Sequence, residues 1–70
     1  MEQWRQVLNH LRDVGGLTQL EATREYGITR LSAVIYVLRH AHGCIIINVQ
    51  RTEPNRYGKL TRFVEYRLIG

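Results

Sequence analysis

Residues 25–40, EYGITRLSAVIYVLRH, indicate an abrupt corner between two helices. Gly27 follows a helical stretch, and a residue just past a helix end often adopts a left-handed conformation that glycine takes without steric cost. Thr29 is a suitable N-cap for a second helix, which we expect over residues 30–40. Ile28 lies between the two helices and is expected to pack inward. The stretch therefore predicts two helices joined by a tight turn.

The helix after the corner has one apolar side and one partly polar side. Its apolar residues recur with the i, i+3, i+4, i+7 spacing of a buried helical face. They are Leu31, Val34, Ile35 and Leu38. The other side holds Arg30, Ser32, Ala33, Tyr36, Val37 and Arg39. This second side carries no acid and has an arginine near each end, so we expect it to face solvent or a partner.

Two further helices are expected before the corner. Residues 2–14 form an amphipathic pattern that ends at paired glycines, and its apolar stripe is Trp4, Val7, Leu8 and Leu11. The sequence T-Q-L-E from Thr18 to Glu21 is a capping box, in which each side chain satisfies a free backbone amide of the other residue. It predicts a short helix that starts at Thr18. Its modest inner face is expected to hold Leu20, Ala22 and Thr23.

After Gly43 the hydrophobic period changes from about 3.6 residues to about 2, which indicates strands. Residues 44–51 and 60–68 alternate in this way, and the segment TEPNRYGK between them is rich in turn residues. The pattern predicts a long hairpin. The expected inner row is Ile45, Ile47 and Val49 on the first strand and Leu60, Val64, Tyr66 and Leu68 on the second. Arg62 falls in that inner register, so we place it at the outer end of the hairpin, beyond the core.

Three helices followed by a two-stranded antiparallel hairpin define an α+β fold, the winged helix-turn-helix, with the hairpin as its wing. A chain of 70 residues forms one domain, so we assign residues 1–70 to it. No apolar run approaches the roughly 20 residues of a membrane span. The first residues, MEQWRQ, lack the pattern of a secretory signal, and the single cysteine cannot form an internal disulfide. We expect an intracellular protein.

The charge balance favours a polyanionic partner. Ten basic residues oppose six acidic ones, for a net charge of +4, and nine of the ten are arginine. The planar guanidinium suits phosphate and base edges better than the lysine ammonium does. Charge alone does not decide whether the partner is a nucleic acid, since many small basic proteins are basic only for solubility.

Three stretches carry a resemblance to a known family. "LTQLEA", "GITRLSAVIYVLR" and "NRYGKLTRFVEYRL" resemble the small winged helix-turn-helix DNA-binding domains of phages and prophages. The resemblance implies a cytoplasmic protein of a bacterial host cell that binds double-stranded DNA. It further implies a transcriptional regulator, or an excisionase-like architectural factor that assists a recombinase.

The predicted helix 30–40 is the element expected to enter the DNA. The major groove is about 12 Å wide and admits one helix. Thr29 and the helix N-terminus would approach phosphate, and Arg30 would make a forked contact with guanine. Ser32, Ala33 and Tyr36 would touch base edges, a thymine methyl or the backbone.

The predicted wing supplies a second set of DNA contacts. Its cations are Arg51, Arg56, Lys59 and Arg62, with Tyr57 among them. Only Glu53 opposes them, so we expect the wing on the minor groove or on flanking phosphates. If about five cations neutralise phosphates, log affinity falls with log salt at a slope near −4 to −5. The wing charges have a second interpretation, in which they only keep the hairpin edge from pairing with neighbours.

Other chemistry is weakly indicated. His40, His42 and Cys44 are zinc-competent but straddle a helix end and a turn, without a second ligand pair. Cys44 with His10 or His42 lacks a walled pocket and an orienting third group. We therefore expect no enzyme activity, metal, cofactor or small-molecule substrate.

A protein-interaction module is the alternative function. In this interpretation the same scaffold binds or inhibits a phage or host protein. The outer row of the first strand, Cys44, Ile46 and Asn48, would form an apolar patch with Val37. The sequence also leaves a homodimer open.

Overall fold

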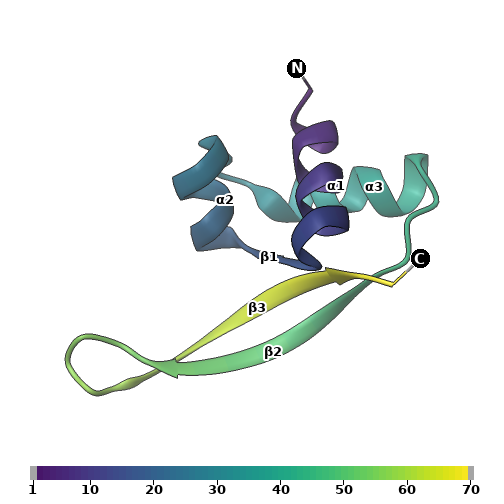
Figure 1. The fold of residues 1–70 in the computed structure, drawn as a ribbon. Coiled ribbons are helices and arrows are strands. Elements are labelled where there is room, and N and C mark those ends of the chain that lie inside the picture. Colours follow the sequence, from purple (N-terminus) through teal and green to yellow (C-terminus); the bar gives the residue numbers. More distant parts are fainter. Residues whose placement is uncertain (1, 70) are drawn as a thin grey trace.

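The computed structural model describes residues 2–69 and contains three helices and one three-stranded sheet. The elements are α1 (Gln3–Val14), β1 (Gly16–Thr18), α2 (Gln19–Tyr26), α3 (Leu31–Ala41), β2 (Ile46–Pro54) and β3 (Leu60–Leu68). The helices lie on one side of the sheet, and the β2–β3 hairpin extends beyond them (Figure 1). This arrangement confirms the predicted α+β fold of a winged helix-turn-helix.

The hydrophobic core lies where the three helices meet the base of the sheet. The buried stripe of α3 is the one predicted from the sequence. The core consists of Val7, Leu11, Leu17, Ala22, Ile28, Leu31, Val34, Ile35, Leu38 and Ile46. Burying one large aliphatic side chain contributes about 1.5 to 3 kcal/mol, so this cluster fixes which side of α3 remains at the surface.

The corner between α2 and α3 is closed by a side chain from α2. Gly27 ends α2 in the left-handed conformation, with φ of 67°. Gln19 Oε1 accepts a hydrogen bond from the Leu31 amide at 2.9 Å, and Gln19 Nε2 donates to the Ile28 carbonyl at 2.8 Å. The Thr23 hydroxyl also donates to the Ile28 carbonyl, at 3.0 Å. The free backbone groups at the corner are therefore satisfied across the turn.

The predicted capping role of Thr29 is wrong. Arg30, one residue later, occupies the N-cap position of α3, and its side chain forms no cap hydrogen bond. The reason is that Gln19 already satisfies the Leu31 amide, so the corner needs no local cap. Thr29 is left exposed.

The predicted capping box of α2 is confirmed. The Glu21 amide donates to Thr18 Oγ1 at 3.2 Å, and the Thr18 amide donates to Glu21 Oε1 at 3.0 Å. Thr18 is the N-cap, so the helix itself begins at Gln19. Ala22 is buried as expected, but Leu20 is 66% exposed and the prediction that it packs inward is wrong. Two residues from Ala22, Leu20 points to a different side of the short helix.

A third strand, β1, was not predicted. It pairs antiparallel with β3 through Gly16–Arg67, Leu17–Tyr66 and Thr18–Glu65, which makes β3 the central strand. A Cβ at Gly16 would lie 2.8 Å from a carboxylate oxygen of Glu65, so this close approach suits glycine.

The rows of the first wing strand are reversed relative to the prediction. Ile46 is 6% exposed and belongs to the core, whereas Ile45 is 60% and Ile47 42% exposed. The Cys44 amide donates to the Leu38 carbonyl at 3.0 Å, which extends the end of α3 into the turn. The buried row of this strand is thus shifted by one residue relative to the prediction. Because strand side chains alternate, such a shift places every side chain of the strand on the opposite face.

The second wing strand follows the prediction at its base and departs from it at its tip. Tyr66 and Leu68 pack against the core, but Leu60 is 73% exposed. The hairpin is longer than predicted, since β2 continues to Pro54, and its outer part extends past the helices (Figure 1). Arg62 lies in this outer part, as predicted, and is exposed. None of the helices within residues 2–69 has the length and apolar character needed to cross a lipid bilayer.

We predict that Gln19→Ala lowers the free energy of unfolding by about 1 to 2 kcal/mol, because the Leu31 amide and the Ile28 carbonyl lose a partner at the corner. Urea denaturation measures the change. Arg24→Ala is the control on the same helix, with an expected change within about 0.5 kcal/mol. Equal stabilities of the two variants would show that Gln19 does not hold the corner.

Candidate nucleic-acid interface

The exposed side of α3 carries most of the residues predicted to read DNA. Ser32 and Ala33 are exposed, and Tyr36 is 63% exposed. The sequence prediction missed His40, which is exposed one turn after Tyr36, with ring centroids 4.2 Å apart. The i+4 spacing was the signal that it would share this side. The result is a small-residue surface at the start of α3 and an aromatic pair near its end.

The N-terminal end of α3 exposes both Thr29, expected to approach phosphate, and Arg30, expected to contact guanine. Thr29 and Arg30 are exposed, and neither forms an ion pair among residues 2–69. The positive end of the α3 dipole lies at this point, and it favours an anion near the first turn. Contacts of Thr29 and Arg30 with DNA stay a prediction.

Arg39 does not belong to the free surface of α3. Its guanidinium donates to the Ile46 carbonyl from Nε at 3.1 Å and from Nη2 at 2.7 Å, and Nη2 also donates to Asn48 Oδ1 at 2.6 Å. The side chain is thereby tied to β2.

The carbonyl that Arg39 binds lies on the open edge of the sheet. The Ile69 amide donates to the Ile45 carbonyl at 2.8 Å, so this pair of residues is hydrogen-bonded across the hairpin. In an antiparallel ladder the next residue, Ile46, directs its carbonyl away from the partner strand. Arg39 therefore covers part of the unpaired edge of β2 and joins α3 to the base of the wing.

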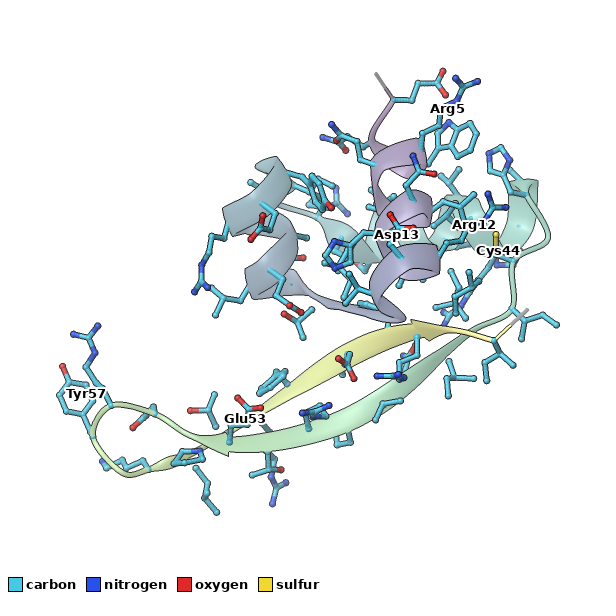
Figure 2. The ribbon with its side chains drawn as sticks, viewed as in Figure 1. Arg5, Arg12, Asp13, Cys44, Glu53 and Tyr57 are labelled. Carbon is cyan, nitrogen blue, oxygen red and sulfur yellow. The ribbon has the colours of Figure 1, made fainter. Side chains whose placement is uncertain are left out.

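The tip of the wing presents its predicted cations on a turn closed by hydrogen bonds. Arg56 and Lys59 are exposed, and Tyr57 is 79% exposed. Asn55 Oδ1 accepts from the Tyr57 amide at 2.9 Å and from the Lys59 amide at 3.1 Å. Figure 2 places Tyr57 at the far end of the wing, well clear of the helices.

The remaining two wing cations differ in their surroundings. Arg51 lies 3.1 Å from a carboxylate oxygen of Glu65 and 3.5 Å from one of Glu53, so much of its charge is offset. Arg62 lies on the opposite face of the hairpin and has no ion pair among residues 2–69. Glu65 also opposes the wing cations, beside the predicted Glu53, and it comes close to Arg51 only through the register of β2 and β3.

The predicted apolar patch does not form. Ile46 lies in the core, and Cys44 packs partly against it. The reversed register instead exposes Ile45, Ile47 and Ile69, with Ile45 and Ile69 joined by a backbone hydrogen bond. Within residues 2–69, no three histidine, cysteine, aspartate or glutamate side chains are grouped as ligands for a metal ion.

Comparison with known proteins gives one match. The family model described as "Winged helix-turn-helix domain" matches residues 2–69. No curated protein and no solved structure matches the chain. The match covers nearly the whole sequence and agrees with the observed order of helices and strands.

We predict that Arg39→Ala lowers the free energy of unfolding by about 1.5 to 3 kcal/mol, because charged hydrogen bonds to a half-buried carbonyl are lost. The uncovered edge of β2 should also increase self-association, measured by analytical ultracentrifugation. Arg62→Ala is the control and should change neither property. A stable, monomeric Arg39→Ala variant would contradict the assigned role.

Proposed function

The chain belongs to the winged helix-turn-helix domain family, a membership that suggests DNA binding, and we propose that it binds double-stranded DNA sequence-specifically. The observation that carries the proposal is the distribution of unpaired cations. Arg30 stands at the start of an acid-free helix, and Arg56, Lys59 and Arg62 stand on the wing.

In this proposal α3 enters the major groove with its exposed side against the bases. Arg30 is the one arginine of this side left for a forked contact with guanine, because Arg39 is held by β2. The middle of the surface offers the small side chains of Ser32 and Ala33 and the ring of Tyr36. Such a surface suits thymine methyls and close approach to the backbone more than a row of bidentate contacts.

The wing tip adds contacts that position the domain. Arg56, Lys59 and Arg62 bind flanking phosphates or the minor groove, and Tyr57 lies among them. Arg51 is left out of the set, because Glu65 and Glu53 offset its charge. With these three cations on phosphates and Arg30 on a base, the expected slope of log affinity against log salt becomes about −3.

The biological role is the broader part of the proposal. We assign the protein to transcriptional regulation in a phage or prophage, acting in the cytoplasm of a bacterial host. The support is the resemblance of "GITRLSAVIYVLR" and "NRYGKLTRFVEYRL" to phage winged-helix domains. An excisionase-like architectural role uses the same contacts. Genomic binding sites next to a promoter favour the regulator, whereas sites next to a recombination end favour the architectural factor.

A second candidate function, a protein-interaction module, is favoured by the exposed isoleucines. One face of the sheet exposes three isoleucines, Ile45, Ile47 and Ile69. A group of exposed apolar side chains on a small domain often marks contact with another protein. A homodimer formed through this face would present two copies of α3 to two half-sites. Ultracentrifugation at several concentrations, with and without DNA, distinguishes a monomer from this dimer.

We predict that the double variant Arg56→Ala/Lys59→Ala weakens binding to all duplexes and makes the salt slope shallower by about 2, since two phosphate contacts are lost. Fluorescence anisotropy across a salt series measures both effects. Arg12→Ala, an exposed arginine of α1 (Figure 2), is the control and should leave the slope unchanged. Equal slopes for wild type and the double variant would remove the wing from the interface.

We predict that Arg30→Ala relaxes sequence preference by about 1 to 3 kcal/mol at one base pair, while binding to random duplex changes little. Selection of sites from random DNA with both proteins measures the preference. No enriched site with the wild-type chain would contradict sequence-specific recognition.

We further predict that replacing a contacted thymine by uracil, which removes only its methyl group, weakens binding about two- to fourfold. Anisotropy titrations with singly substituted duplexes measure the loss. Uracil outside the bound site is the control. If no position within the site responds to the loss of its methyl, α3 does not read thymine through its small side chains.

A further inference from the structure

A groove with a volume of about 520 Å³ lies between the first turn of α2 and the inner part of the wing. Its walls come from Thr18 to Glu21 on one side and from both strands of the hairpin on the other. It contains none of Thr29, Arg30, Ser32, Ala33 and Tyr36 on the α3 side and none of the wing-tip cations Arg56 and Lys59. Arg62 is not part of its walls either, although its neighbours Thr61 and Phe63 are, because Arg62 points to the opposite face of the hairpin. The groove is therefore distinct from the residues assigned to DNA.

Apolar side chains face this groove from both walls. Leu20, 66% exposed, projects from α2, and half-buried Phe63 lies on β3, with the neighbouring Val64 also part of the wall. Leu20 contributes nothing to the core, although leucine is the kind of residue that folding usually buries. Leu20 and Phe63 therefore give the groove an apolar side chain on each wall.

The charge of the groove is opposite to that of the rest of the molecule. Three of the six acidic residues of the chain, Glu21, Glu53 and Glu65, line it, against one arginine, Arg51. Glu65 is offset by Arg51 and by Arg67, each at 3.1 Å.

The net negative charge at the groove comes mainly from two of these carboxylates. The Glu53 side chain is 58% exposed and lies 3.5 Å from Arg51, farther than the 3.1 Å between Arg51 and Glu65, so Arg51 offsets the Glu53 charge only in part. Glu21 accepts a backbone hydrogen bond within the capping box and forms no ion pair with the described residues 2–69. Figure 2 shows Glu53 partway along the wing, between the tip and the helical body.

We propose that this groove binds a basic, apolar peptide segment of a partner protein, with leucine-like side chains between Leu20 and Phe63 and arginine or lysine beside Glu21 and Glu53. Charge complementarity selects this occupant, because exposed carboxylates repel nucleic-acid phosphates and acidic peptides. The partner would bind while α3 and the wing tip remain free for DNA. The domain would thus connect a duplex to a second protein.

The test uses the full chain labelled with nitrogen-15 and a blocked hexapeptide that alternates leucine with arginine. Titration followed by NMR should shift the amides of residues 18–21 and 63–66. A hexapeptide that alternates leucine with glutamate should leave them in place, and so should one that alternates serine with arginine, because each lacks one of the two chemistries.

Two substitutions test the carboxylates without removing the helix cap. Glutamine at position 21 keeps the capping box, so Glu21→Gln/Glu53→Gln removes the charges alone. The leucine–arginine peptide should bind this double variant about 2- to 30-fold more weakly, as expected for two partly exposed ion pairs. Glu25→Gln, on α2 but outside the groove, is the control and should bind as the wild type does. Leu20→Ser, at an exposed position, should independently lower the affinity for this peptide, because it removes an apolar side chain from the groove wall.

Three results would overturn the proposal. The first is the absence of shifts at residues 18–21 and 63–66 with the leucine–arginine peptide. The second is a response confined to the free edge of β2 at Asn48, Gln50 and Thr52, which would mean strand addition to the sheet. The third is equal affinity of the double glutamine variant, Leu20→Ser and the wild type.

Discussion

The hydrogen bonds of Gln19 across the corner are the constraint on which the functional surface depends. Its amide group binds the Ile28 carbonyl and the Leu31 amide, so α2 fixes where α3 begins. Gly27 provides the left-handed turn, and the apolar stripe of α3 turns its opposite side outward. Because the corner and the core fix one orientation of α3, Arg30, Ser32, Ala33 and Tyr36 are exposed on the same side of the helix. Any DNA contact by α3 follows from that orientation.

The sheet divides the charge of the molecule into two regions. Arg39 covers the edge of β2 at Ile46, and the register of β2 with β3 brings Arg51 to Glu65. Arg39 and Arg51, at the base of the wing, are therefore engaged in internal contacts, whereas Arg56 and Lys59 at its tip are exposed. The same register gathers carboxylates beside α2. A basic chain thus carries a cationic wing tip and an acidic groove, and these favour different partners.

The sequence predicted the elements that depend on local chemistry. Gly27, the capping box at Thr18 and the stripe of α3 are each specified by neighbouring residues, and all three were confirmed. Features that depend on tertiary contacts were missed. Strand β1 forms by pairing with β3, and Gln19, twelve residues before Leu31, binds the Leu31 amide in place of Thr29. The register of β2 buries Ile46 and exposes Ile45 and Ile47. For the candidate site, the exposure of Arg30, Tyr36 and the wing tip was predictable, whereas the engagement of Arg39 and Arg51 was not.

The most direct test of the central claim is an NMR titration of the nitrogen-15-labelled chain with its selected duplex. The claim is that the exposed side of α3 and the wing tip contact one DNA molecule together. The account predicts that amides of residues 30–36 and 55–59 shift at the same DNA concentrations, while those of residues 5–12 in α1 stay in place. Shifts on α1 with an unperturbed α3, or on α3 with an unperturbed wing tip, would contradict it.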